Sequence, residues 1–85
     1  MKTTDDELQS RVRELLQRRY HRVITGDSID GYLGEVPELP GCYTAGTTPD
    51  EALRNLDEAM ALWFEVAVLS GDPIPSPATA LRAIA

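Results

Sequence analysis

The fold is decided by residues 32–56, which read YLGEVPELPGCYTAGTTPDEALRNL. Two runs rich in strand-forming residues, 32–36 and 42–46, lie on either side of a proline-containing turn. Pro40 and Gly41 suit the two central positions of a type II turn, because proline presets φ and glycine accepts a positive φ. Since so short a connection makes neighbouring strands antiparallel, the stretch predicts a hairpin.

A long helix follows the hairpin. Thr48 supplies a capping hydroxyl, Pro49 takes the first helical position and Glu51 occupies the capping-box position. Apolar residues then recur at helical spacing as far as Leu69, and Gly71 is the expected stop. The pattern therefore predicts a helix that begins at Pro49 and ends before Gly71.

Two further elements precede the hairpin. Residues 20–25 are rich in strand formers and lead into a turn, which predicts a third strand. Residues 1–19 predict an amphipathic helix whose apolar face is formed by Leu8, Val12, Leu15 and Leu16. The expected fold class is α+β: a three-stranded antiparallel meander packed on one long helix, with an extra N-terminal helix.

These patterns divide the chain into three parts. We expect an N-terminal helix at 1–19, one domain at 20–77 and a C-terminal tail at 78–85. The tail could be a frayed helix or a fourth edge strand, and its pattern favours neither.

Charge is distributed unevenly along the 85 residues, whose formal net charge is −6. Residues 1–22 hold six basic and four acidic side chains, a balance of +2, whereas residues 23–85 hold two basic and ten acidic ones, a balance of −8. Nucleic-acid binding needs cations against the phosphates, so direct DNA binding is not expected. An acidic body suits a basic protein partner, although acidity that only keeps the protein soluble is an equally good interpretation.

The small size of the chain favours association with another chain. A single cysteine excludes an intrachain disulfide, and one cysteine with one histidine cannot build a four-ligand zinc site, so no cofactor or metal is expected. We therefore expect a homodimer or a higher homo-oligomer. The candidate oligomer contacts are Leu8, Val12, Leu15 and Leu16. No apolar run approaches the ~20 residues of a membrane span, and we expect a cytoplasmic protein.

The sequence offers little catalytic chemistry. His21 has no serine or obvious carboxylate beside it, and Cys42 has no nearby cation to activate its thiol. We therefore expect no catalytic residue, no metal site and no enzymatic activity. The residues proposed to contact a partner are acids of the turns and the outer helix face, together with one aromatic: Glu35, Glu38, Asp57, Glu58 and Phe64. We expect Phe64 to be exposed and Trp63 to lie in the core, because Trp63 continues the apolar stripe of the helix.

Residues 31–42, Gly-Tyr-Leu-Gly-Glu-Val-Pro-Glu-Leu-Pro-Gly-Cys, resemble the signature of the HicB family of antitoxins. The following stretch, 44–56, is similar to the start of that family's helix, and Trp63 and the exit 71–77 also match. The resemblance covers residues 20–77. Its motif residues are Pro37, Leu39, Pro40, Gly41 and Cys42.

The resemblance implies a partial ribonuclease-H-like fold without the catalytic acids of that fold. It also implies a partner, because members of the family bind HicA, a small basic toxin that cleaves messenger RNA, and neutralise it by occlusion within a type II toxin–antitoxin system. Many members carry a C-terminal DNA-binding domain. Only eight residues follow Pro77, so we expect none here.

Two other functions compete with an antitoxin. One is an orphan module of the same fold that regulates or assembles something other than a toxin, and the other is an enzyme derived from the ribonuclease-H-like core. The enzyme is the weakest of the three, because no set of carboxylates stands at convincing positions. A neighbouring gene for a short basic protein with a catalytic histidine would distinguish the antitoxin from the orphan module.

Overall fold

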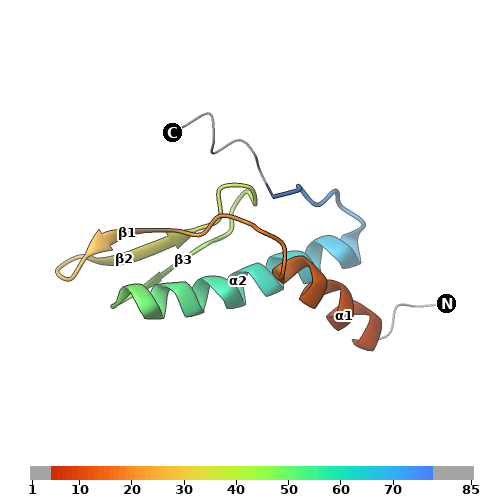
Figure 1. The fold of residues 1–85 in the computed structure, drawn as a ribbon, viewed down its shortest axis with the longest axis horizontal. Coiled ribbons are helices and arrows are strands. Elements are labelled where there is room, and N and C mark those ends of the chain that lie inside the picture. Colours follow the sequence, from red (N-terminus) through yellow and green to blue (C-terminus); the bar gives the residue numbers. More distant parts are fainter. Residues whose placement is uncertain (1–4, 78–85) are drawn as a thin grey trace.

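The computed structural model describes residues 5–77 and gives the α+β architecture that the sequence predicts. Its elements are α1 Asp5–Leu16, β1 Val23–Asp27, β2 Gly31–Glu35, β3 Tyr43–Gly46 and α2 Pro49–Ser70. The sheet forms one layer and α2 the other (Figure 1). The possible fourth strand falls on residues 78–85, which lie outside the described residues.

The sheet is the predicted antiparallel meander, in the order β1-β2-β3. Val23 pairs with Glu35, and Glu35 pairs in turn with Tyr43 across β2. The β1–β2 turn is closed by the side chain of Asp27, whose Oδ1 accepts the backbone N–H of Ile29 at 2.9 Å and of Asp30 at 2.7 Å. Because side chains alternate along a strand, Val23, Glu35 and Tyr43 share the face that α2 leaves uncovered.

Both predicted ends of α2 are confirmed. The Thr48 hydroxyl accepts the backbone N–H of Glu51 at 3.0 Å, and Gly71 ends the helix with a φ of 71°. The Glu51 carboxylate accepts the backbone N–H of Thr47 at 2.6 Å, and this bond holds the pKa of Glu51 below its usual value. Although α2 has 22 residues, none of the helices in residues 5–77 is long and apolar enough to cross a membrane.

Close contact between β3 and the first turn of α2 fixes how the two layers meet. An added Cβ at Gly46 would lie 2.5 Å from the backbone nitrogen of Ala52, so no larger residue fits there without moving the helix. α2 packs mainly beneath β3 and β2, and only its margin reaches β1. The helix is therefore displaced toward the β3 edge of the sheet.

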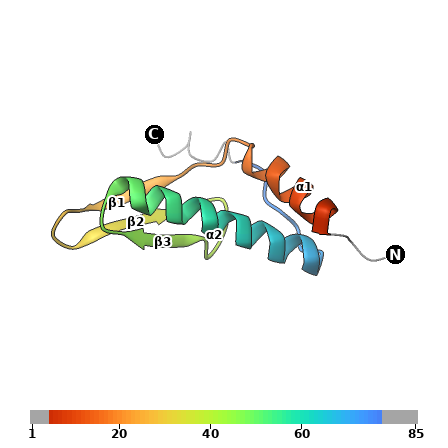
Figure 2. The same ribbon diagram turned by 90° about the horizontal axis from the view of Figure 1, so that it is seen from below.

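α1 packs against α2 of its own chain, beside its C-terminal half and on the side of β1 (Figure 2). Leu8, Val12 and Leu15 are buried in the same cluster as Met60 and Phe64 of α2. Leu16 is partly buried against that cluster. The expectation that this face contacts a second copy is therefore wrong for the three buried residues, because α2 extends beyond the sheet and needs the apolar face of α1 as its cover.

Truncating a buried leucine of α1 tests whether that helix belongs to the core. Leu15 is fully buried, so Leu15→Ala should lower the free energy of unfolding by about 2–5 kcal/mol, through lost burial and the cavity left behind. Urea denaturation followed by circular dichroism measures the change. The matched control is Ile29→Ala in an exposed turn, which should stay within about 0.5 kcal/mol of the parent. Equal stabilities for both variants would contradict the packing of α1.

Candidate functional site

Residues 36–42, here called the motif loop, connect β2 to β3 through two successive turns. The backbone N–H of Leu39 donates to the carbonyl of Val36, and that of Cys42 donates to the carbonyl of Leu39, both at 3.0 Å. The N–H of Val36 donates to the carbonyl of Cys42, also at 3.0 Å, and closes the loop. Gly41 has a φ of 81°, as the predicted type II turn requires.

Three buried side chains of the motif loop and a hydrogen bond from α2 attach the loop to the core. Val36, Leu39 and Cys42 are buried, and Trp63 Nε1 donates to the carbonyl oxygen of Pro40 at 2.9 Å. The loop residues that carry the family resemblance therefore determine the conformation of the loop. Three of them fill the core, and the Pro40–Gly41 turn presents a carbonyl to Trp63.

Glu38 also anchors the motif loop, through His21. Both Glu38 carboxylate oxygens accept the backbone N–H of His21, at 3.2 and 3.1 Å, and His21 Nδ1 lies 2.8 Å from Glu38 Oε2. The Glu38 side chain is only 1% exposed. The expectation that Glu38 faces a partner is therefore wrong, as is the statement that His21 has no carboxylate orienter. The two residues stand 17 positions apart, so no local pattern could have shown the pair.

The pair does not belong to a metal-binding cluster in the part of the chain that the structure describes. Within residues 5–77, no group of three or more His, Cys, Asp and Glu side chains could hold a metal ion. Cys42 is buried, and burial raises the pKa of its thiol, which disfavours the reactive thiolate.

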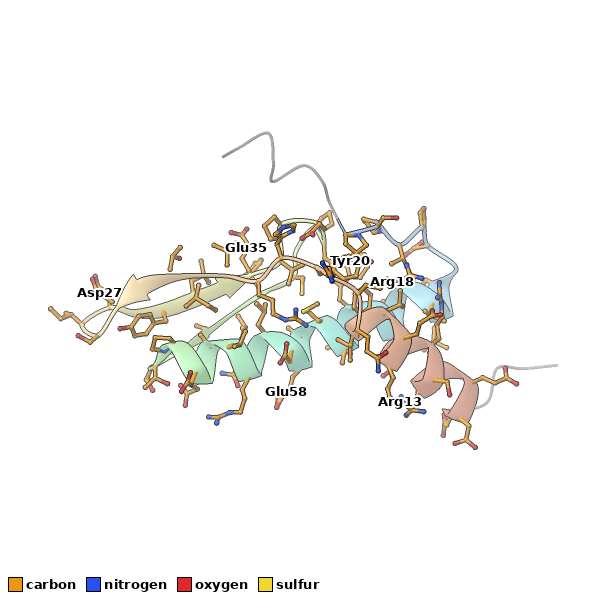
Figure 3. All side chains as sticks on the ribbon, viewed as in Figure 1. Arg13, Arg18, Tyr20, Asp27, Glu35 and Glu58 are labelled. Carbon is orange, nitrogen blue, oxygen red and sulfur yellow. The ribbon has the colours of Figure 1, made fainter. Side chains whose placement is uncertain are left out.

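The remaining acids proposed to contact a partner do not form one surface. Glu35 projects from the face of the sheet that points away from α2, whereas Glu58 projects from the opposite side of the molecule, below α2 (Figure 3). Asp57 lies on α2 and pairs with Arg22, whose Nε is 2.8 Å from Asp57 Oδ1. Glu35 and Glu58 therefore point to opposite sides of the molecule.

The two aromatic residues of α2 exchange the roles expected of them. Phe64 is fully buried and continues the line of Leu56 and Met60 at four-residue spacing, while Trp63 lies at the flank of the helix and is partly exposed. The Phe64 ring packs against Tyr20 with centroids 5.3 Å apart and against Trp63, edge-on, at 5.9 Å. Phe64 is therefore not a surface contact, because Tyr20 and the buried face of α1 belong to the same core cluster and cover it.

A pocket of about 540 Å³ opens beside Trp63, between the start of β3 and the C-terminal half of α2. It is lined in part by Cys42, Tyr43, Leu62, Trp63, Val66 and Pro73. The sequence pattern predicted neither this pocket nor the exposure of Leu62, which lines it. The helical pattern placed Trp63 in the core, and a pocket between a helix flank and a strand edge leaves no periodic signal.

Comparison with known proteins relates the chain to one family. The family described as HicB-like antitoxin of bacterial toxin–antitoxin systems matches residues 20–85. A UPF0150 protein of Thermoplasma acidophilum is 40% identical over 57 residues, which span 67% of this chain and 83% of that protein. A UPF0150 protein of Synechocystis is 37% identical over 49 residues, 58% of this chain and 71% of that protein.

A third relative is the 14.9 kDa protein of the rep-hol intergenic region of Haemophilus phage HP1. It is 39% identical over 46 residues, 54% of this chain, but the matched segment spans only 35% of the phage protein. No solved structure matches the chain with significance. α1 lies outside the matched family segment, which begins at residue 20.

The buried thiol predicts a loss of stability at alkaline pH. The folded-state pKa of Cys42 lies above its ordinary value of 9.0, so above that pH the unfolded chain loses the thiol proton first. The free energy of unfolding should therefore fall as pH rises from 9.0 toward the folded-state pKa. Urea titrations across this range should show a shallower fall in Cys42→Ala than in the parent. Identical slopes would contradict the assignment.

Proposed function

Because this chain belongs to the HicB-like antitoxin family of bacterial toxin–antitoxin systems, we propose that it neutralises a HicA-like, messenger-RNA-cleaving toxin in the cytoplasm by covering it. Family membership is the observation that carries the proposal. The net charge of −6 supports it, because an acidic surface steers and complements a basic ribonuclease.

We propose that the chain acts stoichiometrically and not as an enzyme. A covering function needs a stable surface and no reacting group, and the residues that could supply chemistry are engaged in packing. His21 and Glu38 tie the motif loop to the segment before β1, and Cys42 is buried beneath that loop. Each of these contacts fixes the position of a backbone segment.

The antitoxin role predicts that the chain protects RNA. A purified HicA-like toxin should cleave a messenger RNA, and adding this chain should stop cleavage once the two proteins reach a fixed molar ratio, because an occluded toxin cannot admit substrate. Gel analysis of the RNA measures the effect, with the chain alone as the control. Undiminished cleavage at excess antitoxin would refute the proposal, as would RNA cleavage by the chain alone that His21→Ala abolishes.

Charge reversal on opposite faces predicts which side of the molecule the toxin covers. Glu35 and Glu58 point apart, so we expect only one of Glu35→Lys and Glu58→Lys to slow association, by roughly threefold or more, and to flatten its salt dependence. Each variant serves as the matched control for the other. Stopped-flow or biosensor kinetics at two salt concentrations give the rates, and equal slowing by both variants would contradict a compact contact.

A further inference from the structure

Three large apolar side chains of α2 stay exposed in a row. Leu62, Val66 and Leu69 are 62%, 53% and 62% exposed, and their spacing places them on one face of the helix. We call them the outer apolar stripe. The buried residues Met60, Phe64 and Ala67 occupy the other side of the same turns. Isolated apolar residues are common on surfaces, but a contiguous stripe marks an interaction site.

The pocket beside Trp63 extends this stripe toward β3. Leu62 and Val66 belong to both, and Tyr43, which is 64% exposed, lies on the strand side of the pocket. Trp63 is fixed in place by its bond to the carbonyl of Pro40, so its ring costs little conformational entropy to cover. A rigid aromatic at a concave, largely apolar site has the features of a binding hot spot.

The charges around the stripe are of one sign. Glu58 precedes Leu62 by one helical turn, and Glu65 lies between Leu62 and Leu69, so both glutamates border the stripe. Residues 55–77 contain no lysine or arginine, and the last turn of α2 adds the negative end of the helix dipole. Neither glutamate takes part in an ion pair within the part of the chain that the structure describes.

We infer that the outer apolar stripe and the adjacent pocket dock a basic protein segment that inserts apolar side chains beside Trp63. This inference rests on the proposed function, since the basic protein is then the toxin, and it centres the contact on the outer apolar stripe of α2, which Glu58 and Glu65 border. A second copy of this chain fits less well, because it would bring the same acids together. Asp72 and Pro73 of the exit segment line the pocket, and the segment then continues to Tyr20, whose hydroxyl donates to the Pro75 carbonyl.

Trp63 is the only tryptophan in the chain, so its fluorescence reports directly on the pocket. The probe is a synthetic peptide of about 15 residues, long enough to form a marginal helix, with leucines on one face and lysines on the other. Titrating it into the full chain should change Trp63 emission saturably. The affinity should fall as salt rises, and a peptide with every lysine replaced by glutamate should not bind.

The variant Leu62→Gln/Leu69→Gln removes the apolar stripe without adding charge. It should weaken peptide binding about tenfold or more, which corresponds to at least about 1.4 kcal/mol. Both positions are mostly exposed, so the variant should fold, and an unchanged melting curve confirms it. Ile29→Gln, at an exposed position in the distant β1–β2 turn, is the matched control and should bind the peptide like the parent.

Two results would overturn the inference. One is peptide binding that Leu62→Gln/Leu69→Gln leaves intact. The other is Trp63 emission that changes with protein concentration in the absence of peptide, together with a larger mass by sedimentation that the double variant abolishes. A second copy of the chain would then occupy this face. The proposed function is tested separately by RNA protection. If the double variant still protects RNA, the chain is an antitoxin that uses another face. If the parent chain binds the peptide but does not protect RNA, the antitoxin role is rejected.

Discussion

α2 is about twice as long as the strands that it covers, and the rest of the structure follows from that mismatch. Its 22 residues extend about 33 Å, whereas a strand of five residues extends about 17 Å. Half of the helix therefore has no sheet above it. Three other segments cover this half: the apolar face of α1, the motif loop and the exit segment through Ile74. Phe64 lies where they converge and contacts Tyr20 and Trp63.

The motif loop is shaped by that convergence. It has to turn the chain from β2 into β3 while filling the space above α2, and two successive turns let Val36, Leu39 and Cys42 point inward together. Backbone N–H groups of the loop satisfy the carbonyls of Val36, Leu39 and Cys42, and Trp63 donates to the carbonyl of Pro40. Packing and hydrogen bonding therefore explain why this loop has specific side chains at Val36, Leu39 and Cys42.

The sequence predicted the elements well because their signals are local. Thr48, Glu51 and Gly71 each act on backbone groups a few residues away, and the Pro40–Gly41 turn depends on its own two residues. The burial of Phe64 could not be predicted in the same way, because the residues that cover it, Tyr20 and those of α1, are distant in sequence. Two further features, the partner of Glu38 and the cover formed by α1, depend on contacts between segments distant in sequence, which no local pattern encodes.

In a two-layer fold, each layer has one face that points outward. In this protein, folding places different requirements on the residues of the two outward faces. Along each strand, side chains point alternately to the core and to the outer face of the sheet. Folding does not require one residue type on the outer face, and Thr25, Glu35 and Tyr43 are accordingly of mixed character. The outer face of α2 has no such constraint, because helix-forming charged residues would serve there equally well. Leu62, Val66 and Leu69 contribute little to the core at their present exposure. With a core this small, leaving them outside costs burial that folding could have used, and the proposed docking partner would cover them.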